Sequence, residues 1–488
     1  MDALPTGPVS PVTTRRAWIA AIVVSAVVAV IPARAGAAAP ADFFGMNVQN
    51  VFDNSSSTWG AQLTALSNGG ITLGRVDARW QSVEPKAPSN GRHTYNWSFY
   101  DSVAQAMAQH NIRWYPIIDY STNWAGVVSG DSNSAVAANH VGDFATYANV
   151  FAQRYGRGGS FWRSHPSLPQ LPVTSYEIWN EENSTRFLHP QSGAPEQFAD
   201  LYMAARSAIK PVDPQAEVVV GGLSLGTEGG GADEISFLQR MVAHRPDMRG
   251  NTDAVALHPY QLLVNDVYAR IARFRATVDQ LLGPQVPLEI TEVGWSTTAV
   301  SDQERGTDLT TLAQTLPRSD CNITRLIPYA WTSPEQNRGN SDDWFGIYNR
   351  NATPKASGSA FVGAVRTMRG MTTAAAPTGT VSICHPTPAV VAGPQLKLFY
   401  ALGRGHSSLR VIARCPTGCR LNIVLLAPRR GAPLRLGHRT IRFSRHRHSV
   451  RFRITHRLRH RHRLVILQVV ATGSNRATTS VSHGVRIR

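Results

Sequence analysis

The fold of this chain is decided by residues 176–183, which read Tyr-Glu-Ile-Trp-Asn-Glu-Glu-Asn. The strand-like run at 172–178 delivers an aromatic ring, an amide and a carboxylate in consecutive positions, the carboxylate being Glu181. A second strand-like run, residues 288–296, reads Leu-Glu-Ile-Thr-Glu-Val-Gly-Trp-Ser and presents Glu292 in the same way. Because strand ends present polar groups to a pocket, we expect the two carboxylates to share one site.

Strand-like and helix-like segments alternate from residue 43 to residue 370. Such alternation is typical of a parallel sheet, and eight units of this size predict an α/β fold of the (β/α)8, or TIM, barrel type. The predicted strands are 43–48, 71–77, 113–119, 173–180, 217–223, 254–258, 288–292 and 326–331. The predicted helices are 58–68, 97–110, 142–155, 195–210, 234–244, 266–282, 302–316 and 355–368.

This pattern places both acids at the same end of the barrel. Glu181 ends the fourth predicted strand and Glu292 ends the seventh. Sites in such barrels are built at the carboxyl ends of the strands. A pair of carboxylates there has the residues that hydrolysis of a glycosidic bond requires, since one can protonate the leaving oxygen while the other attacks the sugar or activates water. The sequence therefore predicts a glycosidase.

Residues 1–40 are interpreted as a signal peptide. Two arginines at 15 and 16 precede an apolar run at 17–31, and Ala33-Arg34-Ala35 supplies a small-residue cleavage site. The apolar run is shorter than the ~20 residues that span a bilayer, so no transmembrane span is expected in the mature chain. We expect the protein to be secreted or associated with the cell envelope, with an uncleaved N-terminal anchor as the alternative.

The net charge of +17 arises at the C-terminal end of the chain. Residues 393–488 hold 21 of the 49 Lys and Arg residues and no Asp or Glu. We divide the chain accordingly into a catalytic barrel at 41–371, a Thr/Ala/Pro-rich linker at 372–394 and a basic module at 395–488. Short alternating runs in the module, such as 450–454, predict a small all-β immunoglobulin-like sandwich.

The basic module favours an anionic partner. An anionic envelope polymer is the expected partner of residues 395–488, and a solvated basic face that serves solubility is the alternative. Nucleic acid is not expected, because the segment has few aromatic residues for stacking on bases. Its histidines alternate with arginines that would repel a cation, so neither a metal nor a cofactor is expected.

Four cysteines in an exported chain favour disulfide bonds. Cys321 precedes the eighth predicted strand and Cys384 follows the last predicted helix, so both fall at the bottom of the barrel and could pair. Cys415 and Cys419 could close a small turn. Four independent thiols are the alternative.

Several motifs resemble those of known enzymes. Trp179-Asn180-Glu181 together with Thr291-Glu292 is similar to the retaining glycoside hydrolases of clan A, and within the clan the chain resembles families 39 and 5. Other matching segments are residues 79–85, 95–101, 116–120, 344–346 and 353–355. The resemblance covers about residues 43–370. It departs at Glu182, where those families usually have a proline.

The resemblance implies double displacement on a β-linked poly- or oligosaccharide. Glu292 would be the nucleophile and Glu181 the acid and base, with the carboxyl groups ~5 Å apart. A non-catalytic carbohydrate-binding or envelope-binding protein on a barrel scaffold is the alternative. The sequence predicts neither the sugar nor whether cleavage occurs at chain ends or within chains.

Other polar and aromatic residues are candidates for contacts around the reacting sugar. Asn180 is expected to bind the sugar 2-OH, and Trp331 to form the floor beneath the ring. Arg75 and Tyr260 are expected to hold Glu292 in its charged form. The alternative for Arg75 is a structural ion pair, and His258 is interpreted equally well as a substrate contact or as a hydrogen-bonded residue of the barrel rim.

Overall fold

The computed structural model describes residues 39–40, 42–226 and 231–385, together with seven strands between residues 397 and 486. The predicted signal peptide lies outside the described residues, apart from residues 39 and 40. The predicted turn at residues 415–418 also lies outside them. Within the described part of the chain, no helix is both long enough and apolar enough to cross a membrane.

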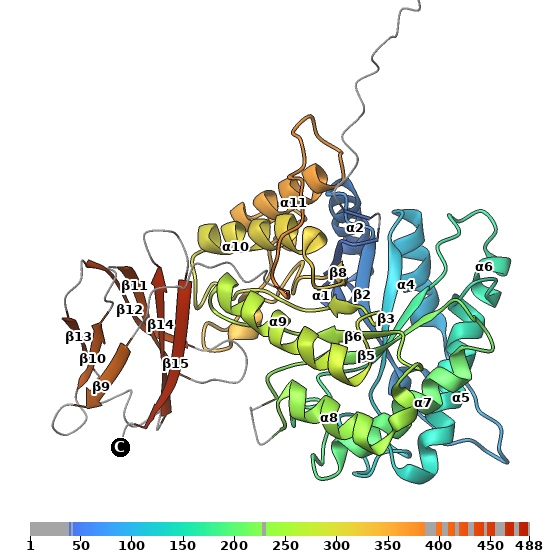
Figure 1. Cartoon of the computed structure of the whole chain (residues 1–488). Helices are drawn as coiled ribbons and strands as arrows, with labels where there is room; N and C mark the ends of the chain where they lie inside the picture. The colour runs from blue at the N-terminus through green and yellow to red at the C-terminus, as the bar shows by residue number, and fades with distance from the viewer. Residues whose placement is uncertain are drawn as a thin grey trace, which may run out of the picture. The chain divides into compact units, whose positions relative to one another are not determined.

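Eight parallel strands form the barrel, in the order in which they occur along the chain (Figure 1). A bridge between Phe44 and Leu326 brings the first strand next to the eighth. The strands are β1 (Gly45–Asn47), β2 (Leu73–Arg79), β3 (Arg113–Asp119), β4 (Ser175–Asn180), β5 (Glu217–Leu223), β6 (Ala254–Leu257), β7 (Leu288–Ile290) and β8 (Ile323–Leu326). The (β/α)8 barrel predicted from the alternating pattern is confirmed.

A long helix follows each strand and packs on the outside of the barrel (Figure 1). Two of these helices begin at a side-chain cap: Asp233 caps the helix at 234–244, and the Ser301 hydroxyl and the Glu304 carboxylate form a capping box at the start of the helix at 302–315. The helices are α2 (Trp59–Asn68), α4 (Ser98–Gln109), α5 (Val141–Tyr155), α7 (Ala194–Ile209), α8 (Glu234–His244), α9 (Val264–Leu281), α10 (Asp302–Thr315) and α11 (Ala356–Met368). Shorter helices are α1 (Gln49–Phe52), α3 (Trp80–Val83) and α6 (Ser160–Ser164).

The eighth strand, β8, spans Ile323–Leu326, so it meets the predicted range 326–331 only at residue 326. Its third residue, Arg325, forms ion pairs with Glu217 at the start of β5 and with Glu289 of β7. Such a charged residue inside the barrel does not follow the apolar pattern by which a buried strand is predicted.

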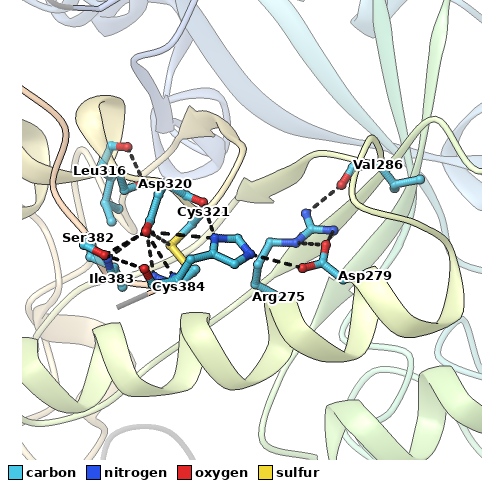
Figure 2. The surroundings of a disulfide bond; sticks show 11 residues. Arg275, Asp279, Val286, Leu316, Asp320, Cys321, Ser382, Ile383 and Cys384 are labelled. Carbon is cyan, nitrogen blue, oxygen red and sulfur yellow. Dashed lines mark hydrogen bonds and ion pairs between the residues drawn. A yellow bond between two sulfur atoms is a disulfide. The ribbon is translucent and has the colours of Figure 1, made fainter. Parts of the chain in front are cut away.

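The predicted Cys321–Cys384 disulfide is present. Figure 2 shows how the segment after α11 is held beside the start of β8. The Asp320 carboxylate accepts hydrogen bonds from the backbone N–H groups of Ile383 and Cys384, both at 2.8 Å. These bonds hold the pKa of Asp320 low, at about 2, even though partial burial opposes ionisation.

The strands after residue 396 are all antiparallel and belong to two sheets. The three-stranded sheet has the order β13-β10-β9, and the four-stranded sheet has the order β12-β11-β14-β15. The strands are β9 (Lys397–Leu402), β10 (Ser408–Arg414), β11 (Cys419–Ala427), β12 (Leu434–Phe443), β13 (Arg447–Arg453), β14 (Leu464–Thr472) and β15 (Thr478–Arg486). An all-β C-terminal region, as predicted, therefore follows the barrel in the chain.

Candidate active site

The structure brings the two predicted acids together at the carboxyl end of the barrel. Glu181 directly follows β4, and Glu292 lies two residues beyond β7. A carboxylate oxygen of Glu181 lies within 4.8 Å of one of Glu292. Their side chains keep only 15% and 11% of their surface exposed. The two acids thus share a narrow, largely enclosed gap.

The backbone at the end of β4 departs from regular strand geometry. Trp179 and Glu181 adopt positive φ angles of 68° and 49°. Residues other than glycine seldom adopt this conformation, and they do so mostly where function requires it. The turns interrupt the alternation of the strand, so that Glu177 and Asn180, three residues apart, both contact Arg75.

Hydrogen-bond donors surround Glu292. Arg75 Nη1 donates to Glu292 Oε1 at 2.6 Å, and the Tyr260 hydroxyl donates to Oε2 at 2.8 Å. Both contacts were expected from the sequence. Burial, together with the nearby charge of Glu292, keeps the pKa of Tyr260 well above its ordinary value, so this hydroxyl retains its proton. Two donors, one of them cationic, favour an ionised Glu292.

Glu177 belongs to this cluster and was not predicted. Arg75 Nε donates to Glu177 Oε2 at 2.7 Å, and Nη2 donates to Oε1 at 3.0 Å. Both side chains are fully buried, as expected for a bidentate ion pair inside a barrel. Arg75 also donates to the Asn180 Oδ1 at 2.9 Å. Arg75 therefore makes the structural ion pair considered as an alternative and also contacts the candidate nucleophile. The signal available in the sequence was a carboxylate inside an otherwise buried strand.

His258 connects this cluster to Glu181. Its Nδ1 lies 2.9 Å from Glu181 Oε1, and its Nε2 lies 3.0 Å from the Thr291 hydroxyl oxygen. Burial lowers the pKa of His258 to about 4, so the ring is neutral and carries one proton. The imidazole is fully buried. It is placed to hold Glu181 rather than to touch a substrate.

The hydrogen-bond directions around His258 determine which nitrogen holds its proton. Thr291 donates its only hydroxyl proton to Glu177 Oε1 at 3.0 Å, so the Thr291 oxygen can only accept from His258 Nε2. The proton of the ring is therefore on Nε2, and Nδ1 offers a lone pair. A lone pair 2.9 Å from Glu181 Oε1 requires a donor, which is the protonated Glu181 carboxyl.

The pKa of Glu181 agrees with a hydrogen bond donated by its protonated carboxyl to His258 Nδ1. Burial raises the pKa of Glu181 to about 7, against the opposing charge of Arg186 and a hydrogen bond from Ser224. A carboxyl with this pKa holds its proton up to neutral pH. The two acids of the site therefore have opposite kinds of partner, since donors face Glu292 and an acceptor faces Glu181.

Trp331 does not occupy the place predicted for it. Its ring has no exposed surface, its Nε1 donates to Gln62 Oε1 at 2.9 Å, and it stacks on Tyr348. A sugar has no access to a ring in this position, so the predicted floor does not fit the geometry. Tyr329, two residues earlier, is partly exposed, and the charge of Glu292 acts on its hydroxyl. Tyr329 is the aromatic residue of this strand end that borders the gap.

Two more buried carboxyls lie near the site without hydrogen-bond partners. Glu182 is fully buried and neither of its oxygens has a partner, and the same holds for Asp119 at the end of β3. Burial raises the pKa of both well above the ordinary range, which opposes their charged forms. Glu182 is the residue at which the sequence departs from the proline expected from the resemblance.

Among the residues that the structure describes, two groups of side chains have the spacing of metal ligands. One consists of Asp320 with Cys321 and Cys384, whose sulfurs are already joined to each other. The other consists of Glu181, His258 and Glu292. In this second group Arg75 already neutralises Glu292, and His258 Nδ1 already accepts from Glu181. The residues of the site thus satisfy one another without an ion.

Comparison with known proteins gives partial matches in sequence and broad matches in fold. The model of glycosyl hydrolase family 14 matches residues 46–160, which end before either acid. A β/α-amylase of Paenibacillus polymyxa is 33% identical over 103 residues, which are 20% of this chain and only 8% of that protein. The family-model match therefore includes Arg75 but neither Glu181 nor Glu292.

Two solved structures share the fold over most of their length. A family 39 glycoside hydrolase from the gut symbiont Bacteroides cellulosilyticus WH2 superposes with a TM-score of 0.52 at 15% identity, covering 84% of this chain and 81% of that one. A family 39 enzyme of Xanthomonas axonopodis pv. citri gives 0.51 at 14% identity, covering 93% and 94%. The chain thus shares the barrel fold of these two family 39 glycoside hydrolases. Within this barrel, Glu181 and Glu292 follow β4 and β7.

Proposed function

We propose that this chain is a retaining glycoside hydrolase that cleaves the O-glycosidic bonds of a β-linked poly- or oligosaccharide. The observation that carries the proposal is the approach of Glu181 and Glu292 to within 4.8 Å between oxygens. Carboxyl groups ~5–5.5 Å apart suit attack on the sugar by one of them, whereas ~6.5–9.5 Å leaves room for a water between them. The opposite environments of the two acids support the same roles.

In the first step Glu292 attacks the anomeric carbon and the bond to the leaving oxygen breaks. Glu181 gives its proton to that oxygen, so the departing group leaves as an alcohol. Asn180, which Arg75 holds through the Asn180 Oδ1, keeps its amide N–H groups for the sugar 2-OH. As charge leaves Glu292 for the new ester bond, Arg75 remains paired with Glu177.

In the second step water displaces Glu292. Glu181, now ionised, takes a proton from the attacking water, and the bond between Glu292 and the anomeric carbon breaks. Two inversions restore the original configuration. Glu181 ends the cycle protonated and Glu292 ends it ionised, which is the state that their hydrogen bonds favour at the start.

The test is a pair of substitutions assayed with aryl glycosides and azide. Glu292→Gly with azide should give a glycosyl azide of inverted configuration, and Glu181→Ala with azide should give one of retained configuration. NMR of the products distinguishes the two anomers. Glu196→Gln changes a half-buried carboxylate in the first turn of α7, which pairs with Arg240 of α8, and is the control. Equal turnover by all variants on every sugar would contradict an enzymatic role and leave the non-catalytic binding protein as the better description.

We propose further that the protein is exported and that the C-terminal strands form a small immunoglobulin-like sandwich that binds an anionic envelope polymer. The two antiparallel sheets after residue 396 support the sandwich. The charge of the segment supports the polymer, because residues 393–488 hold 21 Lys and Arg and no Asp or Glu.

Binding to this module is tested with the full chain. Co-sedimentation with polygalacturonate, with neutral glucan as the comparison, should show binding to the acidic polymer that weakens as salt increases. Replacing Arg410 and Arg414 by Gln should reduce binding and leave hydrolysis unchanged. Equal binding to the neutral polymer would contradict the charge-based proposal. N-terminal sequencing of protein recovered from the medium or the envelope tests export and cleavage near residue 40.

A further inference from the structure

An ion pair joins the two sides of the site above the acids. Arg186, five residues after Glu181, places Nη2 2.7 Å from Oδ2 of Asp342. Asp342 belongs to the segment after β8, in the 3-10 helix η6 (Ser341–Trp344). In a closed eight-stranded order, β4 and β8 lie on opposite sides of the barrel. The pair therefore bridges segments that come from opposite sides of the mouth.

The backbone on the acid side of this bridge is fixed. The Asn133 side chain donates to the carbonyl of Arg186 at 2.9 Å. The indole N–H of Trp179 donates to the carbonyl of the next residue, Phe187, also at 2.9 Å. Arg186 thus projects from a segment that is held both to β4 and to the loop after β3.

The backbone on the nucleophile side is fixed as well. The Ser296 hydroxyl, four residues after Glu292, donates to the carbonyl of Ser341 at 2.8 Å. Asn340 caps η6 by accepting from the N–H of Asp342. The segment that carries Asp342 is therefore held against the loop after β7. Glu181, Arg186, Asp342 and Glu292 lie on one continuous path around the gap.

The charges of the bridge act on the gap itself. The positive charge of Arg186 lowers the pKa of Glu181 against the larger effect of burial, and both Arg186 and Asp342 affect the hydroxyl of Tyr329. The low exposure of the acids, 15% and 11% of their side-chain surface, agrees with walls close around them.

We propose that the Arg186–Asp342 pair walls off one side of the gap between the acids, so that the enzyme releases units from chain ends and does not cut within chains. A polymer that is cut internally must leave the site on both sides, because it continues beyond both neighbours of the broken bond. A site closed on one side admits only the end of a chain. The inference rests on the proposed hydrolysis and adds the class of substrate, which is a free chain end.

The experiment compares viscosity with bond cleavage on the polysaccharide that the wild-type enzyme hydrolyses best. Cleavage at chain ends produces reducing sugar with little loss of viscosity, whereas internal cleavage lowers viscosity early. The wild-type enzyme should produce reducing sugar with little loss of viscosity. Asp342→Ala and Arg186→Ser should each lower viscosity several-fold more per bond broken, and both should release longer products from an oligosaccharide ladder. The pair Arg240–Glu196 has the same 2.7 Å distance between α7 and α8, so Glu196→Ala is the matched control and should follow the wild type.

Internal cleavage by the wild-type enzyme would overturn the inference while leaving the glycosidase proposal intact. An unchanged mode of cleavage in both variants, with melting temperatures showing that they are folded, would also overturn it. Failure of the wild-type enzyme on every aryl glycoside and polysaccharide would contradict the proposed function instead. The two kinds of failure are therefore distinguishable.

Discussion

Glu292 and Glu181 are the same type of residue at the same end of the same barrel, but their surroundings are opposite. Arg75 and Tyr260 direct donors at Glu292, whereas His258 directs a lone pair at Glu181. A carboxylate that meets donors is stabilised in its charged form, and one that meets an acceptor is stabilised with its proton. In the proposed mechanism, the direction of these hydrogen bonds, rather than residue type, decides which acid attacks the sugar and which donates a proton.

The strongest test of this difference is the dependence on the leaving group. Glu292→Gln should abolish turnover of all aryl glycosides, because no nucleophile remains. Glu181→Gln should slow release of poor leaving groups by ~10²–10⁴, the contribution of a positioned acid, but should slow that of the best leaving groups far less in the first step. Burst kinetics across a series of substituted phenols measure both effects. Identical leaving-group dependence in the two variants would remove the distinction between the acids.

Removal of Arg75 should damage both stability and activity. Arg75→Met leaves Glu177 and Glu292 as buried carboxylates without their cation, and breaking a buried pair costs about 3–5 kcal/mol of unfolding free energy. Arg75→Met combined with Glu177→Met should recover much of that stability and none of the lost turnover. Urea unfolding and kcat/KM measure the two quantities. Recovery of turnover in the double variant would show that Glu292 does not depend on the arginine.

The disulfide at the opposite end of the barrel provides a contrast. Its removal should lower stability but leave the protonation of the two acids unchanged. The Cys321–Cys384 bond closes a loop with a separation of 63 residues in sequence. Restricting the unfolded chain in this way stabilises a protein by about 4 kcal/mol. Cys321→Ser with Cys384→Ser should lower the unfolding free energy toward that extent, with an unchanged pH profile at temperatures where the protein is folded. A shifted profile would couple the two ends of the barrel.

The pH profile tests the direction of the hydrogen bonds. Because Glu181 must be protonated and its pKa is about 7, kcat/KM should fall as the pH rises through about 7. Thr291→Val removes the acceptor for His258 Nε2–H, which frees the ring to carry its proton on Nδ1 and donate it to Glu181. Donation to the charged form lowers the pKa of Glu181, so the alkaline limb should move to lower pH. Thr291→Ser keeps the hydroxyl and should keep the profile of the wild type.

A smaller shift in the opposite direction is expected from Arg186. Its charge lowers the pKa of Glu181, so Arg186→Gln should raise that pKa and move the alkaline limb upward by a fraction of a pH unit. The same pH titration of kcat/KM measures this shift, and raised ionic strength should reduce it. A limb that moves downward would contradict the placement of this cation beside the acid.

The sequence was sufficient to predict the barrel, the pairing of Cys321 with Cys384 and the strand ends that carry both acids. These features follow from periodicity, and periodicity is set by local geometry. Glu177 was missed because strict alternation places it on the opposite face from Asn180. The positive φ angle at Trp179, which lies between them, interrupts that alternation, and both contact Arg75. A local pattern does not show such an irregular backbone angle.

The choice between Tyr329 and Trp331 illustrates the same limit. The two aromatic residues are two positions apart beyond β8, so they have the same parity, and the larger ring was predicted to meet the sugar. In the structure Trp331 bonds to Gln62 and is buried, whereas Tyr329 is partly exposed beside Glu292. Arg186 and Asp342 were likewise not predicted, because they meet across loops whose course depends on tertiary contacts.

The junction around Asp320 has a mechanical consequence. The chain beyond α11 is attached to the segment before β8 by the disulfide, by backbone hydrogen bonds between Val381 and residues 318 and 320, and by backbone N–H groups that donate to the Asp320 carboxylate (Figure 2). Tension applied through residue 385 would therefore reach the amino end of β8 first and bypass α11. If the strands after residue 396 bind a surface that moves, the resulting force acts on the end of the barrel away from the acids. The distance between Glu181 and Glu292 then stays unchanged.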